Sequence, residues 1–291
     1  MPYRLLREDA TLEASLRRIA GEELSAALAQ LDGGAGPDAA GVHDIRKRIK
    51  KLRGLLRLVR PGFADYAAEN AALRDTARDL SALRDAEVRI ATFDKVAGSP
   101  CPPGLARARA RLLAHRDEVL AHPAGVEAPR AALARLRERA AGWALTGRDR
   151  DILAEGLAAT RRKARAAGKA ATRTPTIEAL HDWRKRAKDH WYQARLLTPV
   201  WPDMMAVLAE ELSRFTEDLG DHHDLAVLHE MIRNLPAGVV SQKAALDLDR
   251  RIADAQTEIE ARAFPHGARL FAGEPEAMAD LWVRWWRLWR A

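Results

Sequence analysis

The sequence predicts an all-α protein, and three observations support this prediction. Alanine, leucine, arginine and glutamate dominate while aromatic residues make up 5% of the chain, a mixture that favours helices over strands. Apolar residues recur with the helical period, and strand-like alternation is hard to find. Short interruptions rich in glycine and proline separate the periodic segments. With 291 residues, 47% of them hydrophobic, the chain can bury a full core.

The interruptions divide the chain into predicted helices. The segments between them have the length of ordinary helices in globular proteins, or two to three times that length. One interruption, at residues 142–147, lies near the middle of the chain. We expect helix breaks at residues 33–38, 61–62, 98–104, 142–147, 172–176, 199–202, 236–238 and 265–275.

One motif occurs once on each side of this midpoint. The segment VHDIRKRIKKLRGLLRLVRPGF, which begins at Val42, matches LHDWRKRAKDHWYQARLLTPVW, which begins at Leu180, at a constant offset. A second pair, residues 80–88 and 219–227, follows in the same order. We infer an internal duplication: a single domain over residues 1–291, made of repeat halves 1–143 and 144–291, each a helical bundle packed on its twin.

The first copy of the motif forms a basic stripe along one side of a helix. At about 100° per residue, its basic side chains fall within an arc of roughly 120°. The apolar side chains fall on the opposite side, which predicts a helix buried along one face and exposed along the other. The basic set is His43, Arg46, Lys47, Lys50, Arg53 and Arg57, and the apolar set is Ile45, Ile49, Leu52, Leu56 and Val59.

The second copy repeats the stripe with a few changes. Trp191 stands at the position of Arg53, and His190 at the position of Leu52. The basic residues that it keeps are His181, Arg184, Lys185, Lys188 and Arg195.

Unmixed cations on one helix face indicate an anionic partner. Neighbouring like charges repel one another by about a few tenths of a kcal/mol per pair, so a stripe kept twice indicates that an anion is bound there. Arginine matches phosphate oxygens with a fork of donors, and lysine adds a mobile charge. Two facing stripes would form a cationic channel. The alternative is an ordinary solvated surface, although such helix faces usually mix charges of both signs.

Further basic residues extend the candidate surface. Arg84 and His223 lie in the second motif pair, and Arg162 and Arg165 belong to a crowded basic turn. We include these four residues in the predicted phosphate-binding set. The aspartates of the motifs are expected to orient basic neighbours or to cap helices: Asp44, Asp85, Asp182 and Asp224.

Charge and cysteine content indicate the class of partner and the compartment. The net charge is +7 and the isoelectric point is about 9.8, which favours acidic partners in general. The single cysteine, Cys101, cannot form an intramolecular disulfide, and this fits a reducing cytosol. Charges interrupt the N-terminal segment where a signal peptide would be apolar, and no apolar stretch is long enough to span a bilayer. We expect a soluble, cytoplasmic protein without a membrane partner.

At these motifs the sequence resembles the CHAD family, which is named for its conserved histidines. The family pattern includes two histidine-headed basic helices, here His43-Asp-Ile-Arg46-Lys47 and His181-Asp-Trp-Arg184-Lys185, together with the second motif pair. The resemblance covers essentially the whole chain. It implies two helical bundles related by a pseudo-twofold axis around a central basic groove or cavity. It also implies non-catalytic binding of inorganic polyphosphate and association with polyphosphate granules.

Binding of RNA or another nucleic acid is the second candidate function, because phosphate contacts supply much of that affinity. Proteins that bind single strands usually add aromatic side chains on which bases stack. The first stripe contains no aromatic residue, and Trp183, Trp191 and Tyr192 occur only in the second copy, where core packing also explains them.

A metal-dependent phosphohydrolase is the third candidate. His-Asp pairs begin both stripes, and the cluster Asp221-His222-His223-Asp224 lies near His229. Metal-assisted phosphoryl transfer needs carboxylates or histidines that converge on the ion, whereas the first two pairs are followed by arginine and lysine, which repel a cation. No phosphate-binding loop of the GxxxxGK[ST] type is present. We therefore expect no enzymatic activity, no metal and no cofactor.

The C-terminal segment LWVRWWRLWR places four tryptophans on one helix face. We expect them to close the core of the second half, with a homodimer or granule contact as the alternative. The four residues are Trp282, Trp285, Trp286 and Trp289.

Overall fold

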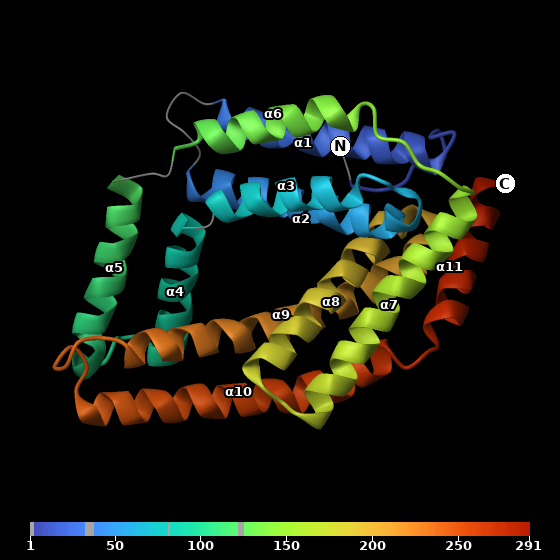
Figure 1. The fold of residues 1–291 in the computed structure, drawn as a ribbon. Helices are drawn as coiled ribbons and strands as arrows, with labels where there is room; N and C mark the ends of the chain where they lie inside the picture. Colours follow the sequence, from blue (N-terminus) through green and yellow to red (C-terminus); the bar gives the residue numbers. More distant parts are fainter. Residues whose placement is uncertain (1–2, 33–37, 81, 122–124) are drawn as a thin grey trace.

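The fold consists of helices joined by short connections (Figure 1). The computed structural model describes residues 3–32, 38–80, 82–121 and 125–291, and the side chains of residues 39 and 82–84 lie outside this description. No strand occurs within these ranges, so the predicted all-α class is confirmed. Within the same ranges, no helix combines the length and the apolar character that crossing a lipid bilayer requires.

The helices in chain order are α1 (Leu12–Leu31), α2 (Ala39–Val59), η1 (Arg60–Gly62), α3 (Tyr66–Asp79), α4 (Ala82–Ala97), η2 (Pro103–Leu105), α5 (Ala106–Ala121), α6 (Glu127–Ala140), α7 (Asp149–Arg173), α8 (Ile177–Leu196), η3 (Thr198–Val200), α9 (Pro202–Arg233), α10 (Gln242–Leu270) and α11 (Pro275–Arg290). Helices α2 and α8 carry the two copies of the basic motif. Both begin at a polar cap: Asp38 Oδ1 accepts a hydrogen bond from the Gly41 amide (2.8 Å), and Thr176 Oγ1 accepts one from the Ala179 amide (3.1 Å).

The prediction of a break beginning at Pro265 is wrong, because α10 continues through this residue and ends at Leu270. A proline inside a helix costs about 3 kcal/mol, so tertiary packing must offset this cost. The packing is close: a Cβ atom added to Gly267 would lie 2.3 Å from Cζ2 of Trp183. Phe264 also packs against the core. The expected break at residues 33–38 falls on residues 33–37, which lie outside the described residues, and the remaining expected breaks fall at helix ends or connections. The ends of α3 at Asp79 and of α5 at Ala121 were not predicted.

The apolar side of α2 is buried as the pattern predicts. The side chains of Ile45, Ile49 and Leu56 have no exposed surface, and Leu52 is 1% exposed. Burying a side chain of this kind contributes roughly 1.5–3 kcal/mol. This packing fixes the rotation of α2 about its axis and therefore sets the direction in which the basic stripe points.

The helices are arranged around two separate apolar cores. In Figure 1, α1 and α6 cover α2 and α3, α7 lies between α8 and α11, and α9 and α10 run side by side. The larger core joins α2, α7 and α8 to the helices that cover them. A smaller core forms where α4 and α5 pack against the C-terminal part of α9 and the N-terminal part of α10.

Helices α2 and α8 cross at a glycine. A Cβ atom added to Gly54 would lie 2.6 Å from the Cβ of Tyr192, so the two helices approach more closely there than a larger residue would allow. Gly54 and Tyr192 occupy the same position in the two copies of the motif. The crossing lies in the C-terminal half of both helices. From this point the N-terminal parts of α2 and α8 diverge from each other in Figure 1.

The C-terminal helix α11 closes the larger core. Trp282 and Trp286 are 3% and 7% exposed, and the ring of Trp282 stacks on His190, with 5.0 Å between centroids. These two residues confirm the predicted core role. Trp285 and Trp289 are only partly buried, and Trp285 contacts Trp201 edge to face at 4.9 Å.

The closest helix contact in the fold yields a prediction about stability. A Cβ atom added to Gly156 of α7 would lie 1.8 Å from the carbonyl oxygen of Leu58 in α2. We therefore expect Gly156→Ala to lower the free energy of unfolding by about 1–3 kcal/mol, because backbone must move to accommodate the methyl group. Urea denaturation followed by circular dichroism measures this change.

Gly21→Ala is the matched control. Gly21 lies inside α1, and a Cβ atom there would meet nothing within 4 Å. Alanine has a higher helix propensity than glycine, so this variant should be more stable than the wild type, by up to about 1 kcal/mol. A Gly156→Ala variant as stable as the wild type would show that α2 and α7 can separate without cost.

Candidate functional site

The basic residues of α2, called here the α2 stripe, differ in how freely they reach solvent. The α2 stripe consists of His43, Arg46, Lys47, Lys50, Arg53 and Arg57. Its three arginines are half-buried, and His43, Lys47 and Lys50 are exposed. The lysine side chains are therefore accessible from solvent, whereas the arginines are partly covered by neighbouring helices.

Arg46 connects α2 to the end of α3. Its Nη1 donates a hydrogen bond of 2.7 Å to the carbonyl oxygen of Ala77, in the last turn of α3. Its Nη2 lies 4.0 Å from Oδ1 of Asp85 in α4. Because the C-terminal end of a helix is partly negative, this contact suits a guanidinium group. Arg46 is therefore oriented before any ligand binds.

Arg53 and Arg57 lie near the C-terminal end of α2. Their side chains turn away from the rest of the α2 stripe, toward α3 and α8. Arg53 Nε donates to Oδ1 of Asn70 (3.0 Å), and Arg57 Nη1 lies 2.9 Å from Oδ1 of Asp189 in α8. Burial, followed by repulsion from Arg57, lowers the pKa of Arg53. These two residues line a different region of the protein from Lys47 and Lys50.

The basic residues of α8, the α8 stripe, are His181, Arg184, Lys185, Lys188 and Arg195. Arg184 Nε donates to the carbonyl oxygen of Thr216 in α9 (3.1 Å). Its guanidinium group fills the space above Gly220, where a Cβ atom would lie 3.0 Å from Nε. The absence of a side chain at Gly220 thus allows Arg184 to lie against α9. Lys185 is exposed and lies 3.4 Å from Asp182.

Lys188 is the most perturbed cation of the α8 stripe. Its Nζ lies 3.5 Å from the centroid of the Trp191 ring, and it donates to Oγ1 of Thr216 at 3.4 Å. Burial lowers its pKa to about 8, and repulsion from Arg184 and Lys50 acts in the same direction. The two helices approach each other at Gly54 and Tyr192, one turn further along both motif copies. Lys50 and Lys188 occupy the same position in the two motif copies.

Trp191 interacts with two cations of the α8 stripe. In addition to Lys188, Cζ of Arg195 lies 4.8 Å from its ring centroid. Cation–π contacts of this kind contribute roughly 0.5–2 kcal/mol. The aromatic ring that replaces Arg53 in the second copy therefore holds neighbouring cations in place.

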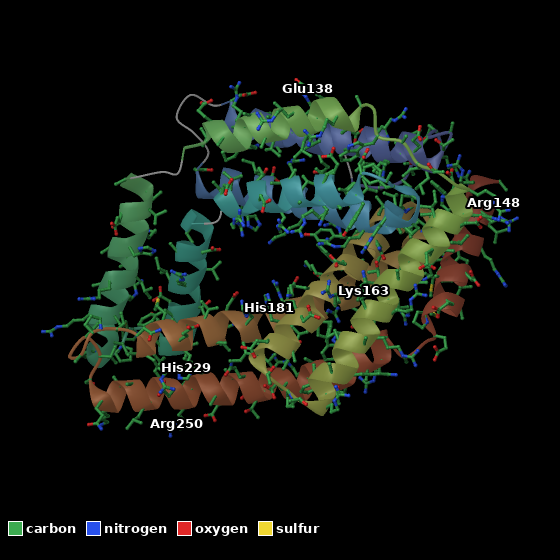
Figure 2. All side chains as sticks on the ribbon, in the orientation of Figure 1. Glu138, Arg148, Lys163, His181, His229 and Arg250 are labelled. Carbon is green, nitrogen blue, oxygen red and sulfur yellow. The ribbon has the colours of Figure 1, made fainter. Side chains whose placement is uncertain are left out.

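His181 of α8, labelled in Figure 2, lies against His223 of α9, with the planes of the two rings tilted by 32°. Their ring centroids are 3.9 Å apart. Burial lowers the pKa of His181 to about 4, with further repulsion from His223, Lys185 and Arg184. Burial also lowers the pKa of His223. Both Nδ1 atoms are buried without a hydrogen-bond partner among the described residues.

The histidine and aspartate cluster of α9 does not converge on one point. Asp221 pairs with Lys95 (2.6 Å), His222 with Glu260 (2.9 Å) and His229 with Asp249 (3.1 Å). In the described part of the chain, no group of three or more histidine, cysteine, aspartate or glutamate side chains is arranged to hold a metal ion.

The structure does not bring Arg162 and Arg165 to the stripes. Arg162 forms 2.6 Å ion pairs with Glu155 and Glu276, and Arg165 forms one of 2.6 Å with Glu274. The crowded basic turn spreads around α7, because successive helical residues point about 100° apart. The side chain of Arg84 lies outside the described residues.

Some residues at the site were not singled out from the sequence. Thr216 and Gly220 position Arg184, and Asp189 receives Arg57. Asp189 occupies the position of Lys51 in the aligned copies. This opposite charge at matching positions is the feature of the sequence that could have identified Asp189 as part of the site. Thr216 and Gly220 carry no signal without the packing of α9.

The comparisons with known proteins agree with this architecture. A family model described as the CHAD domain matches residues 13–233, so the chain belongs to the CHAD family. The crystal structure of the CHAD domain from the plant Ricinus communis is similar to this chain, with a TM-score of 0.59 and 18% sequence identity. The match covers 94% of this chain and 97% of that chain. At this identity the likeness shows the fold alone. No curated protein matches the chain.

The contact between His181 and His223 yields a prediction about proton binding. Because His223 contributes to the low pKa of His181, we expect His223→Gln to move that pKa upward from about 4. The burial of His181 remains, so the pKa should stay below the ordinary value of 6.5. Histidine ring signals followed by NMR against pH measure the shift, and the exposed, distant His115→Gln is the control. An unchanged midpoint in His223→Gln would contradict the coupling.

The same pKa shift has a definite effect on stability. The unfolded chain takes up a proton at His181 near pH 6.5, whereas the folded chain does so only near pH 4. The pair therefore destabilises the fold progressively as the pH falls from 6.5 toward 4 and has no such effect above 6.5. In His223→Gln, this loss of stability should begin at the same pH and be smaller.

Proposed function

We propose that the protein binds inorganic polyphosphate, without catalysis, along the α2 and α8 stripes. The observation that carries the proposal is the crossing of α2 and α8 at Gly54 and Tyr192, which brings together the two helices that carry the stripes. Repulsion from Lys50 of one stripe adds to the effect of burial in lowering the pKa of Lys188 of the other. Such a cluster costs free energy in the folded protein and is stabilised by a bound polyanion. The CHAD family, to which the chain belongs, is associated in general with polyphosphate binding.

The proposal includes a pseudo-twofold arrangement of the two halves, 1–143 and 144–291, about a central basic groove, within one domain over residues 1–291. One contact and one electrostatic effect support it. Gly54 lies against Tyr192, and Lys50 lowers the pKa of Lys188; in each case the two residues are counterparts in the two copies. Contacts between counterparts are expected only near a twofold axis. The axis proposed here therefore passes through the crossing, with the N-terminal parts of both stripes on the same side of it.

The residues of the stripes would divide the task of binding. Arg46 and Arg184 are held by carbonyl oxygens of α3 and α9, so their guanidinium groups would meet phosphate oxygens at little entropic cost. The exposed ammonium groups of Lys47, Lys50 and Lys185 would adjust to successive phosphates along the chain. Bound phosphate would raise the pKa of Lys188 and of His181, because a nearby anion favours the charged form.

The other residues predicted from the sequence do not all belong to the proposed binding surface. His43 and His223 remain in the proposed binding set. His43 lies at the N-terminal end of the α2 stripe, and His223 lies against His181. Arg162 and Arg165 are left out, because glutamates already bind them. We further propose that the protein acts in the cytoplasm, at polyphosphate granules, and needs no cofactor. The partly buried Trp285 and Trp289 are the proposed homodimer or granule contact.

Reversal of one lysine in each half tests the groove. Lys47 and Lys185 occupy matching positions and are both exposed, so Lys47→Glu with Lys185→Glu should leave the fold intact. Each lost charge-assisted contact is worth roughly 1.5–3 kcal/mol, so affinity for polyphosphate should fall by about a hundredfold or more. Isothermal titration calorimetry with polyphosphate measures the loss, and circular dichroism checks the helices.

The control is a reversal of equal charge elsewhere. Arg111 in α5 and Arg135 in α6 are also exposed, and Arg111→Glu with Arg135→Glu changes the net charge by the same amount. This variant should bind polyphosphate with nearly the affinity of the wild type. An equal loss in both double variants would show that only net charge matters, and the groove would be abandoned.

Competition with RNA tests the second candidate function. Trp191 is the one observation that favours RNA, because it is a half-buried aromatic side chain among cations in the α8 stripe. Its ring is already in contact with Lys188 and Arg195, so we expect it to offer little to a base. Polyphosphate should therefore displace labelled RNA of equal phosphate count, and RNA should displace labelled polyphosphate poorly. Equal displacement in fluorescence anisotropy would favour the nucleic-acid function instead.

A further inference from the structure

A second concave site lies beside the α2–α8 crossing, on the side toward which Arg53 and Arg57 turn. The cavity has a volume of about 470 Å³, which lies within the range of roughly 300–1,000 Å³ of small-molecule sites. Its wall is formed by the C-terminal end of α2, by η1, by the first part of α3 and by the middle of α7 and α8. Figure 2 shows Lys163 on the part of α7 that lies beside α8.

Cations outnumber carboxylates in this wall. The charged lining residues are Arg57, Arg60, Lys163, Arg186, Glu155 and Asp189. Both carboxylates already have partners: Glu155 lies 2.6 Å from Arg162, and Asp189 lies 2.9 Å from Arg57. Arg186 is paired as well, because its Nη2 lies 3.2 Å from Oδ1 of Asp182, which is not part of the wall. These pairs leave Arg60 and Lys163 without a neutralising carboxylate among the described residues.

Two of the cations have no acidic partner in the described part of the chain. No ion pair joins Arg60 or Lys163 to a described carboxylate, and the guanidinium group of Arg60 lies over the ring of Tyr66 at 4.7 Å. Burial lowers the pKa of Lys163, and repulsion from Arg60, Arg186 and Arg57 lowers it further, against the opposing effect of Asp189. The cavity thus concentrates positive charge.

Neutral donors stand among these cations. Asn70 lines the cavity, and its Oδ1 accepts from Arg53, which leaves its amide N–H groups as donors. Tyr66 adds a phenol group to the same wall. A wall of guanidinium, ammonium, amide and hydroxyl donors suits an anion with several oxygens in more than one direction.

The matching region of the first half is closed by the chain itself. Arg48 and Lys51 are the counterparts of Arg186 and Asp189, and both bind the buried Glu23, at 3.0 and 2.7 Å. Tyr3 donates to the carbonyl oxygen of Lys51 and packs on Tyr192. In the first half, side chains therefore fill this location and Glu23 neutralises its cations. In the second half, the corresponding location is an open cavity in which cations outnumber carboxylates.

We propose that this cavity is a second phosphate site, which binds a compact oligophosphate through Arg60, Lys163 and Arg186. The inference goes beyond the proposed function, because none of these three residues belongs to the stripes. Arg57 and Asp189 both line the cavity and form an ion pair with each other. The negative charge of Asp189 is therefore neutralised in the wall that the anion would contact. The ligand has the chemistry of adjoining phosphate groups, either in a free pyrophosphate or at the end of a longer chain.

Calorimetric titration with inorganic pyrophosphate tests the site. The wild type should bind one pyrophosphate, and Arg60→Gln with Lys163→Gln should weaken this binding about tenfold or more, because two charge-assisted contacts are lost. The stripe variant Lys47→Glu with Lys185→Glu should retain the affinity of the wild type within about twofold, because its substitutions lie outside the cavity. Glutamine keeps most of the side-chain length, and thermal unfolding verifies that the variant folds.

The outcomes separate this proposal from the polyphosphate function. Failure of the wild type to bind pyrophosphate, or a loss confined to the stripe variant, overturns the cavity site. If Arg60→Gln with Lys163→Gln does not fold, Lys163→Gln alone is titrated, and full retention of pyrophosphate affinity then overturns the site. A titration with long-chain polyphosphate identifies the source: weaker binding in the cavity variant indicates a chain end, and unchanged binding indicates a free oligophosphate.

Discussion

The crossing of α2 and α8 is the constraint on which the rest of the structure depends. Gly54 allows the backbone of α2 to lie against Tyr192, and apolar side chains on the far side of α2 fix its rotation. With position and rotation set, Lys50 and Lys188 must lie near each other, and Arg57 must meet Asp189. A bulkier residue at position 54 would separate the helices and disturb both sites together. Packing at one point therefore decides where the charges of both sites are placed.

Repulsion among the cations is managed differently at the two sites. In the α8 stripe, the carbonyl and hydroxyl of Thr216 accept from Arg184 and Lys188, and the ring of Trp191 faces Lys188. These neutral partners hold the cations without cancelling their charge. In the cavity beside the crossing, Asp189 pairs with Arg57, and Asp182 pairs with Arg186. Arg60 and Lys163 have no carboxylate partner among the described residues. Neutral acceptors preserve the electrostatic attraction for an anion, whereas the buried Glu23 removes it in the matching region of the first half.

The two halves share a motif and diverge where their surroundings differ. Lys51 in one copy and Asp189 in the other occupy the same position with opposite charge, and each is neutralised by a different neighbour. Leu52 lies in the apolar core, while its counterpart His190 is buried against Trp282. Burial lowers the pKa of His190 to about 3, so this ring packs as a neutral group. Equivalent positions thus keep their geometry while their chemistry changes.

The sequence by itself determined the helical class, the repeated motif and the side of α2 that is buried, because these depend on local periodicity. It also indicated the basic stripes, since residues three and four apart share a helix face whatever the tertiary fold. Only the tertiary structure decided that α10 runs through Pro265, because contacts around Gly267 offset a local cost that the sequence makes visible. It likewise decided that Arg162 and Arg165 bind glutamates near α11 while Lys163, in the same turn, lines a cavity with Arg60. These partners are distant in sequence, and their proximity depends on how helices pack rather than on the pattern of any one helix.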